Sequence, residues 1–276
     1  MGNRGSYVAL AAIVLGTLVW AAPASATVTI GQVGDASGSA CDPNFDALEP
    51  VPPSGNPYVA PGVGTITSWS MRAVAPAGQQ LTMKMFRQVG APGNYQAVGH
   101  AGPQTLTPGS LNTFPANIRV QPGDALGLHT ITADSRCAIQ APGAILFIAS
   151  PSDLADGASG PFEADEENAG LNIQATFEPD NTFKLLKTKR NRNKGNAVLT
   201  FGLPNAGTLS GSGGGAKVAK AKTVAAGKAK LKVKARGLKS RTLNSNGKLK
   251  LKIQVIYTPT GGDAKAKKLK VKLLKS

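Results

Sequence analysis

Lysine at every second position is the most conspicuous chemical pattern in this chain. Three segments carry it, with the cations Lys228, Lys230, Lys232, Lys234 and Arg236; Lys248, Lys250 and Lys252; and Lys268, Lys270 and Lys272. The residues between them are mostly Ala, Leu and Val, and successive side chains of a β-strand point to opposite faces. Each segment therefore predicts a strand with an apolar face and a row of ammonium groups. Such rows bind polyanions by releasing counterions.

The other ionisable side chains match no catalytic motif. No nucleophile elbow, zinc-binding helix, phosphate-binding loop or dinucleotide fingerprint occurs, and His100 and His129 are expected to be isolated structural residues on strand edges. The acidic group at 153–167 lacks calcium-loop spacing and predicts a solvated loop; its members are Asp153, Asp156, Glu163, Asp165, Glu166 and Glu167. We expect no catalytic residue, metal site or cofactor. Carboxylates far apart in sequence leave a glycan hydrolase as an alternative.

The segments that position the lysines and carboxylates follow a predicted export signal at the start of the chain. Residues 1–26 contain Arg4, the apolar run 8–22 and the small-residue site Ala24-Ser25-Ala26, which predicts a signal peptide cut after Ala26. A retained N-terminal anchor is the alternative. No second long apolar run occurs, so we expect no transmembrane segment in a secreted, extracellular chain with attachment to the cell surface. In that compartment Cys41 and Cys137 predict a disulfide, with two free thiols as the alternative.

Charge divides the mature chain into two modules. Residues 27–182 hold 5 basic and 14 acidic residues, a net charge of −9, whereas 183–276 hold 25 basic residues and Asp263 alone, a net charge of +24. A single domain would intersperse its charges for solubility. We therefore predict an acidic module at 27–180 and a basic module at 183–276, joined near 178–181.

Both modules are predicted to be antiparallel β-sandwiches, so the fold class is all-β. Pro and Gly turn signals recur about every ten residues in the acidic module, which excludes long helices and favours a jelly-roll-like sandwich. Its predicted strands are 64–74, 80–88, 95–101, 112–120, 125–132, 145–149 and 171–177, and its core candidates are Trp69, Met71, Phe86, Leu126, Leu128, Phe147 and Ile173. The basic module adds a strand at 197–203, a flexible loop at 211–215 and a hairpin turn at 259–262. These elements favour an Ig-like or fibronectin III-like sandwich.

Several runs carry a resemblance to known modules. In the acidic module the runs 65–70, 79–84, 111–116 and 120–128, the last containing Gly123-Asp124-Ala125-Leu126-Gly127-Leu128, resemble an uncharacterised module common in secreted actinobacterial proteins. The runs 194–200, 227–233 and 255–262 are similar to the lysine-rich C-terminal domain at the end of many such proteins. The first resemblance implies export and a fold without assigned activity. The second implies an accessory module whose ligand is unknown.

The partner is predicted from charge. The expected function is non-catalytic binding or adhesion, in which the basic module tethers the protein to an anionic cell-wall or extracellular polysaccharide. One alternative is that outward lysines only maintain solubility and block edge pairing. Self-association of the acidic and basic modules is another. Specific nucleic-acid recognition is disfavoured because arginine and stacking aromatics are scarce beside lysine.

Overall fold

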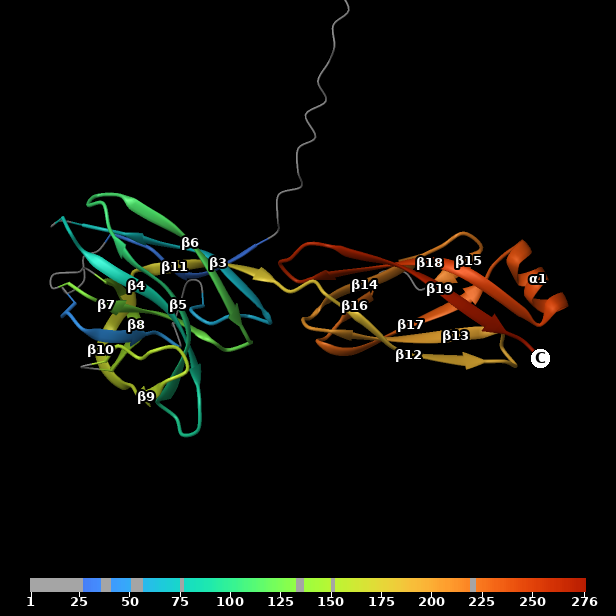
Figure 1. Cartoon of the computed structure of the whole chain (residues 1–276), viewed down its shortest axis with the longest axis horizontal. Coiled ribbons are helices and arrows are strands. Elements are labelled where there is room, and N and C mark those ends of the chain that lie inside the picture. Colours follow the sequence, from blue (N-terminus) through green and yellow to red (C-terminus); the bar gives the residue numbers. More distant parts are fainter. Residues whose placement is uncertain are drawn as a thin grey trace, which may run out of the picture.

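The structure is a computed structural model that describes residues 27–35, 41–50, 57–74, 77–132, 137–149, 152–218 and 222–276. The predicted signal peptide, 1–26, lies outside the described residues. Two β-rich lobes lie in line along the long axis of the molecule (Figure 1), and all named strand pairs are antiparallel. The all-β sandwich prediction is confirmed. Within the described ranges no helix has the length and apolar character needed to cross a membrane.

The first lobe consists of two sheets. Sheet 1 has the order β1 (Val28–Gln32), β11 (Ile173–Pro179), β3 (Gly64–Arg72), β6 (Leu111–Val120). Sheet 2 has the order β10 (Glu163–Leu171), β8 (Ala138–Ala149), β2 (Phe45–Leu48), β7 (Ala125–Thr130), β4 (Gln80–Gln88), β5 (Asn94–Thr105), β9 (Ser159–Pro161). Alternate residues of these strands meet in one core between the sheets, because each strand places every second side chain inward.

The predicted core of the acidic module is largely confirmed. Trp69, Met71, Leu126, Leu128 and Ile173 are buried in the core between the two sheets. Phe86 is also buried, but on the outer face of sheet 2 in a second cluster, where Phe147 is only partly buried. Cys41 and Cys137 form the predicted disulfide, with their Cα atoms 5.8 Å apart.

The run that ends at Leu128 has a clear structural basis. Asp124 is 1% exposed and accepts two hydrogen bonds of 2.7 Å from the Arg87 guanidinium, which fixes the turn before β7. Leu126 and Leu128 then enter the core, and a Cβ on Gly127 would lie 2.2 Å from the Ala47 carbonyl oxygen. Only glycine therefore allows β2 to pair this closely with β7.

The acidic segment 153–167 was predicted to be a solvated loop, but four of its six acidic residues lie on a strand. Glu163, Asp165, Glu166 and Glu167 belong to β10, an edge strand of sheet 2, and only Asp153 and Asp156 lie in a loop. The polar composition concealed this strand because its first half faces solvent on both sides. Strands β1, β2 and β9 were likewise not predicted, since each is short.

The second lobe also consists of two sheets. Sheet 3 has the order β12 (Lys184–Asn191), β13 (Asn196–Leu203), β17 (Gly227–Ala235), β15 (Ala216–Val218). Sheet 4 has the order β16 (Lys222–Val224), β14 (Gly207–Ser212), β18 (Lys248–Pro259), β19 (Lys265–Leu274). Their inward residues form a separate core around Phe201, Leu231 and Tyr257. The predicted hairpin at 259–262 joins β18 to β19, whereas the predicted loop at 211–215 begins later, because Gly211 and Ser212 still belong to β14.

A short helix, α1 (Leu238–Asn246), stands at the far end of this lobe (Figure 1). It was not predicted, because its sequence lacks an apolar stripe and buries only Leu243. Gly247 ends it in the left-handed conformation with φ 63°, donating its backbone N–H to the Leu243 carbonyl.

Asn205 joins the two lobes. Its side-chain oxygen accepts a 2.8 Å hydrogen bond from the Val63 N–H, and its amide nitrogen donates to the carbonyls of Val63 and Asp180. The Tyr257 hydroxyl in turn donates to the Asn205 carbonyl at 2.7 Å. Residues of both lobes therefore form hydrogen bonds with Asn205, and these bonds orient the basic module relative to the acidic one.

One carboxyl group is buried in the acidic module without full hydrogen bonding. Glu49 is 0% exposed; its Oε2 accepts a 3.0 Å hydrogen bond from the Leu171 N–H, and its Oε1 has no partner among the described residues. Burial raises the pKa of Glu49 to about 7, since desolvation penalises the carboxylate. The folded protein thus binds a proton more tightly at this site than the unfolded chain does.

We predict that Glu49 makes the stability of the acidic module fall with rising pH. Because its folded pKa is about 7 and its ordinary value is 4.5, the stabilisation is complete below pH 4.5 and is lost as the pH rises through 7. Glu49→Gln should be more stable than the parent at pH 8 by about 2–3 kcal/mol, with a smaller difference at pH 5. Urea unfolding followed by Trp69 fluorescence measures this. An equal difference at both pH values would contradict the assignment.

Candidate polyanion-binding site

The eleven cations predicted to bind polyanions are all exposed in the basic module. Four lie on the outer face of sheet 3: Lys228, Lys230, Lys232 and Lys234. Six lie on the outer face of sheet 4: Lys248, Lys250, Lys252, Lys268, Lys270 and Lys272. Arg236 follows β17 directly. Leu231, Val233, Leu251, Ile253, Val271 and Leu273 occupy the intervening inward positions and are buried. The structure therefore divides the predicted set between two opposite faces.

On sheet 4 the lysines of neighbouring strands face one another. Lys250 pairs with Lys272, and Lys252 pairs with Lys270, directly across the ladder of β18 and β19. Directly opposite side chains have Cβ atoms about 5 Å apart, and like charges at such positions are destabilising. Among the described residues none of these four lysines forms an ion pair with a carboxylate. We call this face the lysine ladder.

On sheet 3 a neutral strand separates two rows of lysines. The cross-strand register places one residue of β13 between one lysine of β12 and one of β17 in three successive triplets. These triplets are Lys184–Gly202–Lys228, Lys187–Thr200–Lys230 and Lys189–Val198–Lys232. All six lysines are exposed, and the three central residues are partly exposed. We call this face the lysine trough. Lys217 on β15 extends the positive charge by pairing with Lys234.

The sequence prediction missed Lys184, Lys187 and Lys189. Two adjacent leucines, Leu185 and Leu186, interrupt the alternation in β12, and a register shift between Leu185 and Lys187 restores it. The spacing of Lys187, Lys189 and Asn191 was the available signal. A β-bulge, which inserts one residue into a strand, cannot be placed without its partner strand.

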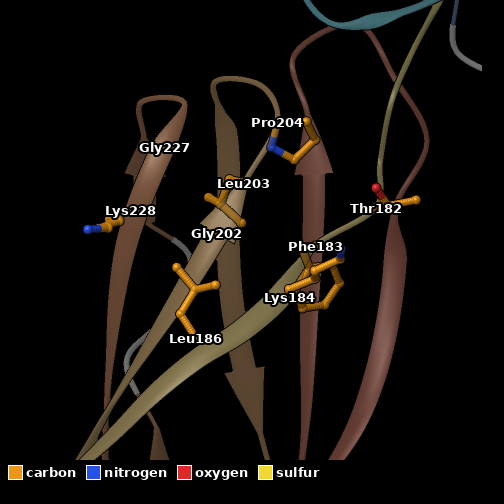
Figure 2. A pocket seen from close by; sticks show the side chains of 9 residues that line it. All are labelled: Thr182, Phe183, Lys184, Leu186, Gly202, Leu203, Pro204, Gly227 and Lys228. Carbon is orange, nitrogen blue, oxygen red and sulfur yellow. The ribbon is translucent and has the colours of Figure 1, made fainter.

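A pocket of about 400 Å³ lies at one end of the trough (Figure 2). Lys184, Gly202 and Lys228 line it together with Leu186, which is 52% exposed. A Cβ on Gly202 would meet the Leu186 side chain at 3.2 Å, so glycine leaves room for this leucine over the central strand. Thr182 and Pro204, on the side nearest the acidic module, complete the wall.

A buried polar cluster in the acidic module was not predicted. Lys84 on β4 is 4% exposed, and its ammonium lies 2.8 Å from Asp46 Oδ1 and 2.6 Å from Asp153 Oδ1. A third donation, of 3.0 Å, goes to the Leu154 carbonyl. Asp46 Oδ2 accepts a 2.8 Å hydrogen bond from the Leu154 N–H. The cluster therefore attaches the loop around 153 to the outer face of sheet 2.

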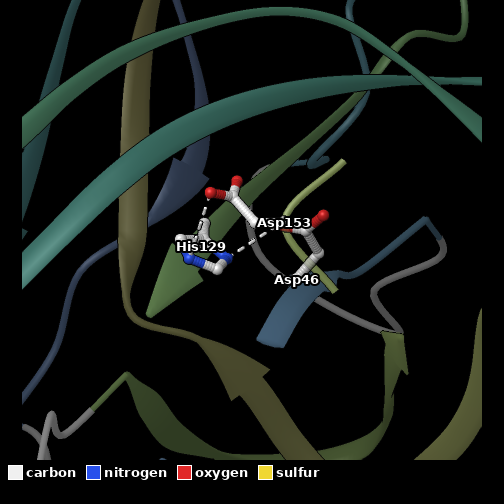
Figure 3. Close-up of side chains that lie close together, drawn as sticks. All are labelled: Asp46, His129 and Asp153. Atoms are coloured by element: carbon white, nitrogen blue, oxygen red, sulfur yellow. Dashed lines mark hydrogen bonds and ion pairs between the residues drawn. The ribbon is translucent and has the colours of Figure 1, made fainter. Parts of the chain in front are cut away.

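The prediction that both histidines are isolated on strand edges is wrong. His129 lies on β7, between β2 and β4, with Nδ1 3.1 Å from Asp46 Oδ1 and Nε2 3.8 Å from Asp153 Oδ2 (Figure 3). His100 lies 2.9 Å from Asp156 through Nδ1. All three contacts join residues more than 20 positions apart, so local spacing could not reveal them.

Asp46, His129 and Asp153 come close enough to suggest a metal site, but the position between the carboxylates is taken. The Lys84 ammonium contacts both Asp46 and Asp153, and the same contact holds the pKa of Asp153 below its usual value. A divalent cation would have to displace this positive charge. A pocket of about 380 Å³ beside the cluster is lined by His100, His129, Asp153 and Asp156. The geometry fits a structural ion-pair network better than a metal site.

We predict that Lys84→Met destabilises the acidic module strongly. The substitution leaves the Asp46 carboxylate buried without its cation, which costs about 3–5 kcal/mol in comparable buried pairs. Arg119→Met is the matched control, because Arg119 is 68% exposed and lies 3.5 Å from Asp180; its effect should be below about 1 kcal/mol. Urea unfolding followed by Trp69 fluorescence compares the two. Equal effects would show that the cluster contributes no more than a surface pair.

Comparison with known proteins gives no guide to what the two lysine faces bind. No family model matches the chain, and no curated protein or solved structure shows a significant match. The resemblance to modules of secreted actinobacterial proteins therefore stays a prediction.

Proposed function

We propose that the protein is a secreted binding protein of adhesion type, whose basic module attaches it to anionic cell-wall or extracellular polymers. The observation that carries this proposal is the direct opposition of Lys250 with Lys272 and of Lys252 with Lys270. Both faces of the module present exposed lysines, and the module contains a single acidic residue, Asp263. A polyanion supplies the negative charge that the fold itself lacks.

The lysine ladder favours polyanion binding over solubility alone as the role of the exposed lysines. Solubility needs net charge and is served by charges of both signs interspersed over the surface. Like charges directly opposite in a sheet lower its stability instead, by up to about 1 kcal/mol for each pair. Two successive lysine pairs therefore lower the stability of the sheet and concentrate positive charge on it. A bound polyanion would neutralise that charge and remove the repulsion.

Export is part of the proposal. The disulfide between Cys41 and Cys137 supports an oxidising compartment outside the cytoplasm. The predicted signal peptide and the resemblance to secreted actinobacterial modules of jelly-roll-like and Ig-like type point the same way. In that setting wall polymers and acidic polysaccharides are the abundant polyanions. The acidic module then carries any specific recognition.

We predict steep salt dependence for attachment of the full mature chain to purified wall material. Binding driven by counterion release is strong at low salt and falls continuously as salt is added. Pull-down across a salt series measures the retained fraction. Retention that is the same at low and high salt would rule out electrostatic tethering.

We predict opposite effects of Lys250→Gln on stability and on binding. The change removes repulsion with Lys272, so the free energy of unfolding of the basic module should rise by about 0.2–1 kcal/mol. Retention on wall material should weaken, with a shallower salt dependence. Lys239→Gln is the control, because Lys239 lies on α1 and not in the ladder. If Lys250→Gln lowers solubility but leaves retention unchanged, the lysines serve solubility only.

A further inference from the structure

We propose that the lysine trough is a binding site for one chain of a linear polymer whose charges are phosphodiesters, lying lengthwise along β13. This inference rests on the proposed function and specifies one of its two faces. It assigns to the trough a ligand of defined shape, whereas the lysine ladder provides only a concentration of positive charge.

The register gives the trough its regular form. Gly202 pairs with Lys184 on one side and with Lys228 on the other, and the same holds for Thr200 between Lys187 and Lys230. Residues paired directly across a sheet point to the same face, so both rows of lysines stand on the same side as the central residues. The rows are two strand spacings apart, about 10 Å, and successive lysines on β17 are about 7 Å apart. On β12 the bulge between Leu185 and Lys187 keeps each lysine opposite its central residue. An extended chain between the rows meets ammonium groups from both sides at regular intervals.

The floor of the trough suits a slim polymer backbone. Val198, Thr200 and Gly202 are small and uncharged, so they do not compete for an anion. The Leu186 side chain lies over Gly202, which leaves Val198 and Thr200 as the uncovered part of the floor. None of the three is aromatic, which leaves no platform for stacked bases and disfavours single-stranded nucleic acid. Near Gly202 the pocket of about 400 Å³, with Leu186 in its wall, gives the trough a hollow end (Figure 2).

Lysine supplies every cation of the trough. All six positions in the two rows are lysine, although the module also contains arginine at positions such as Arg190 and Arg236. Arginine holds planar carboxylates and phosphates alike by paired hydrogen bonds, whereas lysine acts as a compact point charge that sets no planar geometry. A phosphodiester chain carries its charges in the backbone itself, so it can lie on the small floor residues with its charges between the two rows. Arg190 instead donates to the Lys272 carbonyl and does not belong to the rows.

The lysine ladder lacks this arrangement. Its lysine rows lie on adjacent strands, β18 and β19, with no neutral strand between them. A polymer there lies over the charges rather than between them. The two faces can therefore be separated experimentally by a change that fills the trough without altering charge.

The experiment uses the full mature chain and fluorescently labelled glycerol phosphate oligomers of increasing length. Thr200→Tyr fills the trough floor and keeps every lysine; Thr258→Tyr is the matched control on the partly exposed face of β18. We expect Thr200→Tyr to weaken oligomer binding by roughly tenfold or more, and Thr258→Tyr to leave it nearly unchanged. The affinity should rise with oligomer length until the oligomer spans all three cross-strand triplets of the trough, and then level off. Equal effects of the two variants would overturn the proposal.

A second pair of variants covers the case in which Thr200→Tyr fails to fold. Lys187→Gln removes one cation of the trough, and Lys248→Gln removes one at a position of sheet 4 that faces Leu274. The proposal requires the first to weaken oligomer binding more than the second. Stronger binding of uronate oligomers of equal charge would refute the phosphate assignment. Stronger binding of oligothymidylate would refute the preference for a slim backbone without bases.

Failure here is distinguishable from failure of the proposed function. If Thr200→Tyr binds oligomers like the parent while retention on wall material still falls with salt, the trough is not the site and electrostatic tethering stands. If retention on wall material does not depend on salt, tethering itself is wrong.

Discussion

The alternation of side chains along a β-strand governs the basic module. Leu231 and Val233, like Leu251 and Ile253, are buried in one apolar core, and each is separated from the next by a lysine. Once these apolar residues pack, every intervening lysine must stand on an outer face. Burying an unpaired ammonium instead would cost far more than a strand can recover. The distribution of positive charge is therefore a direct consequence of how the core is packed.

Strand order then makes the two outer faces different although their composition is similar. In sheet 4 two lysine-bearing strands are neighbours, which brings Lys252 opposite Lys270. In sheet 3 the neutral strand β13 lies between β12 and β17, so the lysine rows are held apart. The same residue type thus produces successive lysine pairs on sheet 4, whereas sheet 3 has the trough beside a single pair, Lys217 with Lys234. This difference is the basis of our proposal that the trough holds one linear chain, whereas the ladder only concentrates positive charge.

The acidic module uses charge in the opposite way. Its cations Lys84 and Arg87 are paired with buried carboxylates of Asp46 and Asp124, and these pairs fix loops onto the sheets. In the basic module the described lysine rows have no such carboxylate partners. Asn205 connects the two modules through three hydrogen bonds. A module whose buried cations are paired with carboxylates is thereby joined in a fixed orientation to a module whose exposed lysine rows are unpaired.

Period-two alternation and turn residues in the sequence alone determined the all-β class, most of the long strands and the exposure of all eleven predicted cations. The disulfide also followed, because two cysteines in a chain with a predicted signal peptide have few other expected roles. These features depend on local pattern or on composition. The sequence did not reveal β12 as a lysine strand, because the bulge after Leu185 breaks its pattern.

Only the tertiary structure decided which charged residues meet. Asp46, Lys84, His129 and Asp153 come from separate segments, and no spacing rule predicts that β2, β7 and β4 lie side by side in sheet 2. Likewise, whether lysine rows face each other or flank a neutral strand depends on sheet order and register. Both are set by long-range packing of the two cores, and a one-residue slip in pairing would move every lysine to the opposite face.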